Sequence, residues 1–191
     1  MKKIILITGG QRSGKSTKAE QLALSLSSNP VYLATAHVWD DEFRLRVQKH
    51  QERRGPEWTN IEEEIHLSKH DLSGRVVVID CVTLWLTNLI SIEHETSLAV
   101  PSDQAERDIL GEAKRQSRAE HYLARAKAEF DAFTAPDATY IFVTNEIGSG
   151  GVSTNALQRR FTDLQGWMNQ YIAQKADEVI LMVSGIPVKI K

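Results

Sequence analysis

Eight residues near the start of the sequence have the types and spacing of a phosphate-binding loop. Residues 9–16 read Gly-Gly-Gln-Arg-Ser-Gly-Lys-Ser and fit the pattern G-x-x-x-x-G-K-[ST]. Glycines let backbone N–H groups curl around phosphate oxygens, and a helix that begins here adds a partial positive charge. Lys15 could then reach the β- and γ-phosphates of a nucleoside triphosphate, and the Ser16 hydroxyl could bind Mg²⁺. The alternative is a Gly-Ser turn that happens to precede a lysine.

A carboxylate at the end of an apolar run is the second candidate. Residues 75–80 read Arg-Val-Val-Val-Ile-Asp, so Asp80 stands where a Walker B acid holds Mg²⁺, directly or through water. A single acid at a strand end is also often a helix cap or a turn residue. The phosphate-binding loop upstream favours the metal role, and Cys81 beside it is interpreted as a small buried residue.

Residues 40–54 form a stretch that opens with acids and closes with bases, the polarity that a helix dipole favours. Within it His50 has four basic neighbours: Arg46, Lys49, Arg53 and Arg54. These charges penalise the imidazolium form and should keep His50 neutral near pH 7, and a neutral imidazole is a usable nucleophile. The alternative is a surface histidine on a basic helix, which the spacing alone favours.

Residues 144–151 leave another apolar run with polar groups and three glycines. In open α/β sheets, ligands lie beyond the carboxyl ends of the strands. Asn145 and Glu146 could therefore contact substrate or metal, or they could only shape a turn.

Short apolar runs without clean alternation are typical of parallel strands covered on both faces. Five such runs are predicted to be strands: Lys3–Thr8, Val31–Thr35, Arg75–Asp80, Thr139–Thr144 and Glu178–Ser184. Helical patterns separate most of them, including one long helix over 103–133 that follows an expected loop at 91–103. The sequence therefore predicts an α/β P-loop fold, RecA-like, with helices on both faces of a mostly parallel sheet. Residues 185–191 should add an antiparallel edge strand.

Length and composition set limits on the class of protein. The 191 residues carry a net charge of −2, contain one cysteine and have no run long enough to span a membrane. These values predict one domain over residues 1–191 and a cytoplasmic protein, and they argue against a dedicated nucleic-acid binder.

The motifs, taken in order, resemble one family. The segments that carry the resemblance are 8–15, Ala34-Thr35, 40–42, the basic stretch with His50, Trp58 with Glu62, 80–88, 144–148, 155–161 and 184–191. Together they are similar to the bifunctional adenosylcobinamide kinase and adenosylcobinamide-phosphate guanylyltransferase of cobalamin biosynthesis. Residues 152–154 read Val-Ser-Thr where the family pattern has Val-Pro-Glu, so the resemblance gives them no role.

The resemblance implies two reactions. ATP or GTP phosphorylates the aminopropanol hydroxyl of adenosylcobinamide, and GMP then passes from GTP through a guanylyl-histidine to give adenosylcobinamide-GDP. It implies His50 as that histidine, Mg²⁺ at Ser16 and Asp80, a corrinoid substrate and a homotrimer. With Ser16 from the motif, the expected nucleotide contacts are Thr8, Gly9, Gly10, Gln11, Arg12, Ser13, Gly14, Lys15, Ser16, Leu33, Ala34, Thr35, Gln51, Glu52, Arg53, Arg54, Glu62 and Asp80.

Two other classes remain open at this stage. A small-molecule P-loop kinase would use Lys15 and Asp80 but not a nucleophilic His50. A regulatory GTPase would need an Asn-Lys-x-Asp motif, which the sequence does not contain. The D-x-x-G match at 71–74 precedes a predicted strand, whereas the switch motif should begin at a strand's end.

Overall fold

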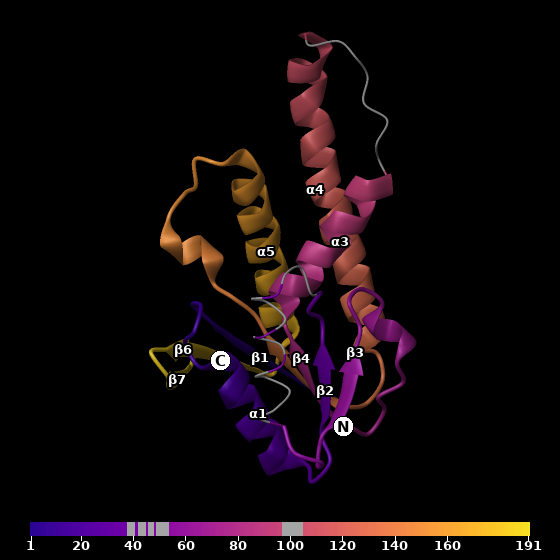
Figure 1. The fold of residues 1–191 in the computed structure, drawn as a ribbon, viewed down its shortest axis with the longest axis vertical. Coiled ribbons are helices and arrows are strands. Elements are labelled where there is room, and N and C mark those ends of the chain that lie inside the picture. Colours follow the sequence, from indigo (N-terminus) through magenta and orange to yellow (C-terminus); the bar gives the residue numbers. More distant parts are fainter. Residues whose placement is uncertain (38–40, 42–44, 46–47, 49–53, 97–104) are drawn as a thin grey trace.

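The computed structural model of the chain is built on one sheet of seven strands (Figure 1). It describes residues 1–37, 41, 45, 48, 54–96 and 105–191. The strands are β1 (Lys3–Gly9), β2 (Val31–Ala34), β3 (Thr59–Glu62), β4 (Val76–Asp80), β5 (Thr139–Val143), β6 (Glu178–Val183) and β7 (Ile186–Lys189). The helices are α1 (Lys15–Leu26), α3 (Val82–Thr96), α4 (Ala105–Phe133) and α5 (Ala156–Lys175), with short 3₁₀ turns η1 (Leu67–Lys69) and η2 (Ile147–Gly150).

The strand order places the phosphate-binding loop near the middle of the sheet. The order is β3-β2-β4-β5-β1-β6-β7, and every neighbouring pair is parallel except β6 and β7. One strand, β5, lies between β1 and the strand that ends in Asp80, which is the RecA-like arrangement. The prediction of a mostly parallel P-loop sheet with an antiparallel edge strand at the end of the chain is confirmed.

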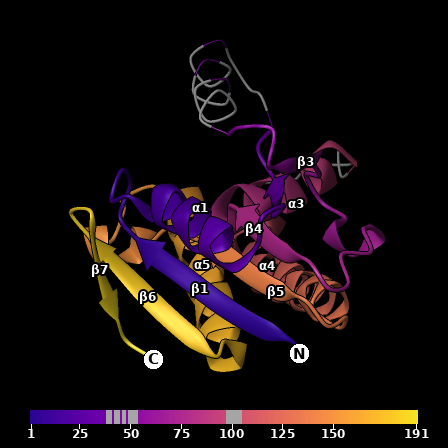
Figure 2. The ribbon, with the colours of Figure 1, turned by 90° about the horizontal axis from the view of Figure 1, so that it is seen from below.

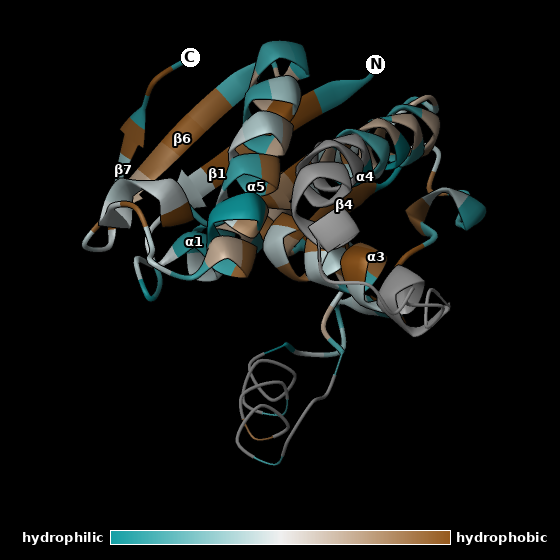
Figure 3. Cartoon of the chain, turned by 90° about the horizontal axis from the view of Figure 1, so that it is seen from above, coloured by the Kyte–Doolittle hydropathy of each residue, from teal (hydrophilic) through white to brown (hydrophobic). Residues whose placement is uncertain are grey.

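Helices cover both faces of the sheet, as predicted (Figure 2). Alternate residues of β1 point to opposite faces because side chains in a strand have a period of two. Ile5 and Ile7 pack in the cluster that contains α1, whereas Ile4 and Leu6 pack in the cluster that contains α4 and α5. All four side chains are at most 2% exposed, and each such burial contributes about 1.5–3 kcal/mol. Figure 3 shows the hydrophobic strands β1 and β6 beside α5, whose outer surface is mostly hydrophilic.

Aromatic side chains join the end of α4 to the middle of the sheet. The ring centroids of Phe130 and Phe142 are 5.1 Å apart, and those of Phe133 and Tyr140 are 5.2 Å apart. Such tilted and edge-on pairs add about 0.5–1.5 kcal/mol each beyond the area they bury. The long helix predicted over 103–133 is confirmed from Ala105 onward, and its carboxyl end is anchored by these rings.

The loop predicted at 91–103 is wrong in its first half. Helix α3 continues to Thr96, and the residues from 97 to 104 lie outside the described part of the chain. Trp85, Leu86 and Leu89 are at most 2% exposed and fix the first turns on the sheet. Once those turns have formed, each further residue adds a backbone hydrogen bond at little cost, so the polar residues continue the helix. The Ser91 hydroxyl also donates to the Thr87 carbonyl at 3.0 Å.

Strand β3 was not predicted. Its residues alternate between half-buried and exposed, and it pairs only with β2 at the edge of the sheet. The sequence Thr-Asn-Ile-Glu contains no apolar run, so the hydrophobic pattern gives no signal there.

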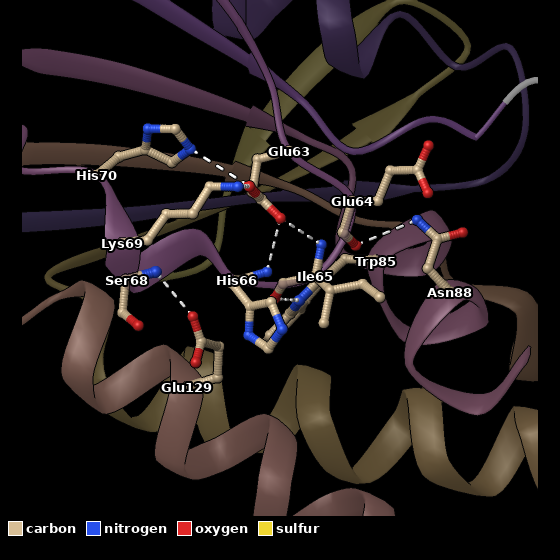
Figure 4. A network of polar contacts seen from close by, with 10 residues as sticks. All are labelled: Glu63, Glu64, Ile65, His66, Ser68, Lys69, His70, Trp85, Asn88 and Glu129. Atoms are coloured by element: carbon tan, nitrogen blue, oxygen red, sulfur yellow. Dashed lines mark hydrogen bonds and ion pairs between the residues drawn. The ribbon is translucent and has the colours of Figure 1, made fainter. Parts of the chain in front are cut away.

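A polar network fixes the connection between β3 and β4 (Figure 4). The Glu63 carboxylate, 6% exposed, accepts hydrogen bonds from the backbone N–H groups of Ile65 and His66 at 3.0 and 2.8 Å. It also pairs with Lys69, and His70 lies 3.4 Å away. Burial by itself raises the pKa of Glu63, but the hydrogen bonds from Lys69, Ile65 and His66 outweigh it and lower that pKa to about 2. The charged form of this side chain is therefore part of the folded structure.

We expect Glu63→Gln to lower the free energy of unfolding by about 1–3 kcal/mol at pH 7. The folded-state pKa lies below the ordinary value of 4.5, so the stabilisation is complete above pH 4.5 and is lost as the pH falls towards 2. Urea unfolding of both proteins at pH 7 and pH 3.5 should therefore show a gap that narrows in acid. Glu120→Gln, on the exposed surface of α4, is the matched control and should show neither effect. A gap that stays constant with pH would refute the role of the charge.

Candidate nucleotide-binding site

The chain between β1 and α1 forms the tight loop that the motif predicts. Positive φ angles occur at Gly9 (150°), Arg12 (57°) and Gly14 (94°). A Cβ on Gly9 would lie 2.6 Å from the Met182 carbonyl oxygen and 2.8 Å from Ser13 Oγ, so only glycine fits there. Gly10 has nothing within 4 Å of such a position, so packing in the protein does not require its small size. The loop therefore curls back against β6, and the start of α1 points into the interior of the loop.

Lys15 lies inside this curl rather than in solvent. The side chain is 7% exposed, and its Nζ donates to the Gly10 carbonyl at 2.6 Å and to Ser13 Oγ at 3.5 Å. Burial lowers the pKa of Lys15, while Cys81 and the Asp80 carboxylate oppose that shift. Around the same loop Thr8 and Ser13 are buried, Ser16 is half-buried, and Gln11 and Arg12 are exposed. The ammonium group is thus held by weak carbonyl and hydroxyl partners, which a phosphate could replace.

Asp80 ends β4 beside this loop and is held by a tyrosine. The Tyr32 hydroxyl donates to Asp80 Oδ2 at 2.7 Å, and Tyr32 is 4% exposed. Burial, followed by the nearby Asp80 charge, raises the pKa of Tyr32 well above its usual value, so the hydroxyl stays a donor. Burial also raises the pKa of Cys81 to about 12, which agrees with its interpretation as a small neutral residue. One oxygen of the Asp80 carboxylate is therefore fixed at the carboxyl ends of the strands, where the phosphate-binding loop also lies.

The side chains at the end of β2 pack and form hydrogen bonds inside the protein rather than facing the nucleotide site. Leu33 is 0% exposed in the core, so its side chain only packs. Thr35 is also fully buried, and its hydroxyl donates to the Cys81 carbonyl and accepts from the Cys81 N–H, both at 2.8 Å. Ala34 is half-buried and pairs with Asp80 in the sheet. Any nucleotide contact predicted at 33 and 35 is left to the backbone.

Glu146, which follows β5, contacts the strand that leads into the phosphate-binding loop. Its Oε1 accepts from the Thr8 hydroxyl at 2.7 Å, and its backbone N–H donates to the Gly9 carbonyl at 3.1 Å. The same Oε1 accepts from Asn169 Nδ2 on α5 at 3.2 Å. Of the two roles left open for Asn145 and Glu146, a turn alone does not account for Glu146, because its side chain reaches the first strand.

Four residues that support the site were missed from the sequence. Tyr32, Thr144, Gln165 and Asn169 are all buried. The Thr144 hydroxyl donates to Asn169 Oδ1 at 2.7 Å and accepts from Gln165 Nε2 at 2.7 Å. A signal was available, because Gln165 and Asn169 are polar residues spaced i, i+4 among the apolar residues that α5 buries, and buried amides need partners.

Of the basic stretch at 40–54, the structure describes residues 41, 45, 48 and 54. The predicted nucleophile His50 and the predicted contacts at Gln51, Glu52 and Arg53 lie outside the described residues. Arg54 stacks over Tyr32, with its Cζ 3.7 Å from the ring centroid, and its Nε donates to Asn60 Oδ1 at 2.8 Å. One of its two terminal nitrogens, Nη1, is buried without a hydrogen-bond partner among the described residues. That unsatisfied donor is suited to an anion.

The predicted contact Glu62 and a second histidine, His37, lie at the β2–β3 side of the sheet. Glu62 is exposed at the end of β3. His37, the alternative nucleophile if His50 fails, lies with its Nδ1 2.9 Å from Glu64 Oε1, and both side chains are 44% exposed.

Two absences bear on the site. No described helix is long and apolar enough to cross a membrane. No group of three or more His, Cys, Asp or Glu residues in the described part of the chain could hold a metal ion by itself. A Mg²⁺ bound with a nucleotide needs fewer protein ligands, because phosphate oxygens and water supply the rest.

The P-loop follows β1 of a RecA-like sheet and encloses the buried Lys15. Asp80 ends β4, which one strand separates from β1. These features together define a nucleoside-triphosphate-binding protein. Comparison with known proteins shows to which family of nucleotide-binding proteins the chain belongs. Residues 5–190 match the family model of cobinamide kinase / cobinamide phosphate guanyltransferase. The chain belongs to this family, and is thus an enzyme with kinase and guanylyltransferase activities.

Curated relatives agree over their whole length. The chain is 37% identical to the bifunctional adenosylcobalamin biosynthesis protein CobU of Escherichia coli, covering 98% of this chain and 99% of that protein. It is 34% identical to the bifunctional adenosylcobalamin biosynthesis protein CobP of Pseudomonas aeruginosa, covering 97% and 96%. A solved structure of a prototypical ATPase from a bacterial type III secretion system matches 95% of this chain and 51% of its own at 9% identity and a TM-score of 0.49. This structural similarity is too weak to support the fold assignment, which depends on the strand order.

We expect Lys15→Ala to leave the fold intact and to reduce both activities by at least about 100-fold. The reason is that each reaction needs a triphosphate held through its β- and γ-oxygens, and this ammonium lies inside the only P-loop motif of the sequence. Steady-state assays of each product, with circular dichroism as the folding check, measure this. Lys18→Ala, one turn further along α1, is the matched control. Normal kinase turnover by the Lys15 variant would overturn the P-loop assignment.

We expect Tyr32→Phe to weaken the response to Mg²⁺ while retaining the buried ring. Without the hydroxyl, Asp80 loses the hydrogen bond that fixes its orientation, so the Mg²⁺ concentration for half-maximal rate should rise about 3- to 10-fold. A Mg²⁺ titration at saturating nucleotide gives the result. Tyr171→Phe removes a comparable hydroxyl–carboxylate bond to Asp131 far from the loop and serves as the control. Equal titrations for the two variants would exclude a role for Tyr32 in positioning Asp80.

Proposed function

We propose that the P-loop described above serves both reactions of the family. In the first, the enzyme phosphorylates the aminopropanol hydroxyl of adenosylcobinamide with ATP or GTP. In the second, it transfers GMP from GTP to the product to give adenosylcobinamide-GDP. The observation that carries the proposal is the buried Lys15 ammonium within the curl of residues 9–14, next to Asp80, in a chain whose family model spans 5–190.

In the kinase step the protein supplies position and charge. The acceptor hydroxyl releases its proton to water as its oxygen forms a bond to the γ-phosphorus. The bond from that phosphorus to the β-phosphate oxygen breaks, and the nucleoside diphosphate leaves. Little covalent chemistry is asked of the protein, because this transition state is loose and its charge is spread over the phosphoryl oxygens. Lys15 and the backbone N–H groups at the start of α1 bind those oxygens and neutralise the developing charge.

In the transfer step His50 is proposed as the nucleophile. Its imidazole nitrogen bonds to the α-phosphorus of GTP and pyrophosphate leaves. The phosphate oxygen of adenosylcobinamide phosphate then attacks the same phosphorus and releases the histidine. The family match supports this role, and so does Arg54. The Nη1 of Arg54 is a buried donor without a partner among the described residues. Its guanidinium stacks on Tyr32, which also holds Asp80.

Ser16 and Asp80 are proposed to hold Mg²⁺ with the triphosphate. The donors fit, because a hydroxyl and a carboxylate are hard oxygen ligands and Asp80 uses only Oδ2 for Tyr32. When bound, the ion would neutralise charge on the phosphate oxygens.

Two alternatives are less well supported. A kinase without transfer activity would use Lys15 and Asp80 but would have no use for a nucleophilic His50. A regulatory GTPase is disfavoured because Asp71 lies in a turn before β4, where its Oδ1 accepts from the Ser73 N–H at 3.1 Å. That turn is at the amino end of β4, away from the phosphate-binding loop. We also propose, from the family resemblance, a homotrimer of single-domain chains (residues 1–191) in the cytoplasm.

We expect His50→Asn to abolish the protein–GMP adduct and the formation of adenosylcobinamide-GDP, because an amide cannot serve as the nucleophile. Phosphorylation of adenosylcobinamide should stay within about 3-fold of normal, since direct transfer of the γ-phosphoryl needs no protein nucleophile. Incubation with α-labelled and, separately, γ-labelled GTP distinguishes the two reactions in one preparation.

His37→Asn is the matched control, and it should keep the adduct. If the His50 variant retained label from the α-position and the His37 variant lost it, the nucleophile would be His37. If neither wild type nor variants retained label, the transfer would not proceed through a covalent intermediate.

A further inference from the structure

A cavity of about 730 Å³ lies between η2, α5 and α4. One wall is the loop from Gly148 to Ser153, another is α5 from Ala156 to Trp167, and Ala119 of α4 closes a third side. Figure 1 shows this loop and the first half of α5 at the end of the sheet towards which the parallel strands point. The P-loop follows β1 at the same end, so the elements that line the cavity and the nucleotide site lie at one end of the sheet.

The walls combine an apolar face with polar groups of both kinds. Trp167 is 40% exposed and Val152 is 88% exposed, so both side chains offer apolar surface to a molecule in the cavity. Arg160 supplies N–H donors, and Asp163 supplies acceptor oxygens. A ligand that fits these walls has a broad apolar surface and a rim of uncharged groups that both donate and accept hydrogen bonds.

The two arginines of the motif at 155–161 have different tasks. Arg159 Nη1 donates to the carbonyls of Ser153 and Thr154 at 2.8 and 2.9 Å, so it shapes the loop. The Asn155 side chain caps α5 by accepting from two backbone N–H groups. Arg160 is half-buried at the cavity and makes no hydrogen bond or ion pair within the described part of the chain. It is therefore the guanidinium that is available to a ligand.

One wall of the cavity follows closely in sequence on a residue that contacts β1 and the start of the phosphate-binding loop. The loop at 148–153 follows Glu146, which bonds to Thr8 through its side chain and to Gly9 through its backbone. A molecule in the cavity would thus lie against the segment that adjoins the P-loop. Phosphoryl transfer needs the acceptor oxygen next to the triphosphate, so an acceptor site has to adjoin the P-loop in this way.

We propose that this cavity binds the corrinoid acceptor by one edge of its macrocycle. The proposal rests on the function proposed above and names the acceptor site that goes with it. The face of a corrin is apolar and suits Trp167 and Val152, whereas its carboxamide side chains are neutral groups that donate and accept, which suits Arg160 and Asp163. A corrinoid is larger than the ligands that pockets of about 300–1,000 Å³ enclose, so the rest of the macrocycle stays outside.

The test separates acceptor binding from nucleotide chemistry. The variants are Arg160→Gln, Arg160→Lys and Trp167→Leu, with Gln170→Ala on the exposed face of α5 as the matched control. Binding of cobinamide without nucleotide is measured by equilibrium dialysis, followed by its visible absorbance. The KM values for adenosylcobinamide and for GTP are measured in the kinase reaction, and label from α-labelled GTP on the protein is measured without acceptor.

We expect Arg160→Gln and Trp167→Leu each to weaken cobinamide binding and raise the KM for adenosylcobinamide about 10-fold, with Arg160→Lys in between. The KM for GTP and the protein–GMP label should stay within about 2-fold of wild type, which also shows that the variants fold. Unchanged cobinamide binding in both variants, with an active wild type, would overturn the cavity assignment alone. A wild type that neither binds nor phosphorylates cobinamide would instead overturn the proposed function, and the assignment with it.

Discussion

The contact between Gly9 and Met182 is the constraint on which the nucleotide site depends. Because a Cβ at residue 9 would lie 2.6 Å from a carbonyl oxygen, the loop can press against β6 only if that residue is glycine. The loop is then held from both sides. The Gly185 N–H, in the turn between β6 and β7, donates to the Ser13 carbonyl at 3.0 Å, and the Glu146 N–H donates to the Gly9 carbonyl at 3.1 Å. The hairpin at the end of the chain is therefore a support for the phosphate-binding loop and not only a sheet edge.

The second support is a set of buried polar groups that joins β1, β5 and α5. Thr8, Glu146 and Asn169 form one chain of hydrogen bonds, which Thr144 and Gln165 extend into the helix. Groups of this kind stabilise a fold only when they find partners. Gln165 Oε1 is buried without a partner among the described residues, so it is the hydrogen bonds of Thr144, Glu146 and Asn169 that favour one position of α5 relative to the strands. Since the other side of α5 lines the cavity, the same helix connects the geometry of the phosphate-binding loop with that of the proposed acceptor site.

The sequence predicted those features whose signal is local. The P-loop, five parallel strands and the antiparallel edge strand each follow from short runs of residue types, and all of them are present. Strand β3 and the second half of α3 were missed, because pairing with β2 and helix propagation override a polar composition there. Tyr32 was missed for a different reason. Its partner Asp80 is 48 residues away, and nothing in a strand of apolar residues shows which hydroxyl will reach across to the neighbouring strand.

Tyr32 contacts both Asp80, at the end of β4, and Arg54, at the end of the basic stretch. Its hydroxyl holds Asp80, its ring carries the guanidinium of Arg54 at 3.7 Å, and the Trp58 ring packs edge-on against it at a centroid distance of 5.8 Å. A cation on a buried ring is stabilised more than one in water, so Arg54 can lie at this end of the sheet although no carboxylate among the described residues forms an ion pair with it. A carboxylate there would compete with phosphate for the guanidinium, whereas the ring leaves Nη1 to an anion. The arginine at the end of the basic stretch and the carboxylate at the end of β4 are thus set by one side chain, and any shift of β2 moves both together.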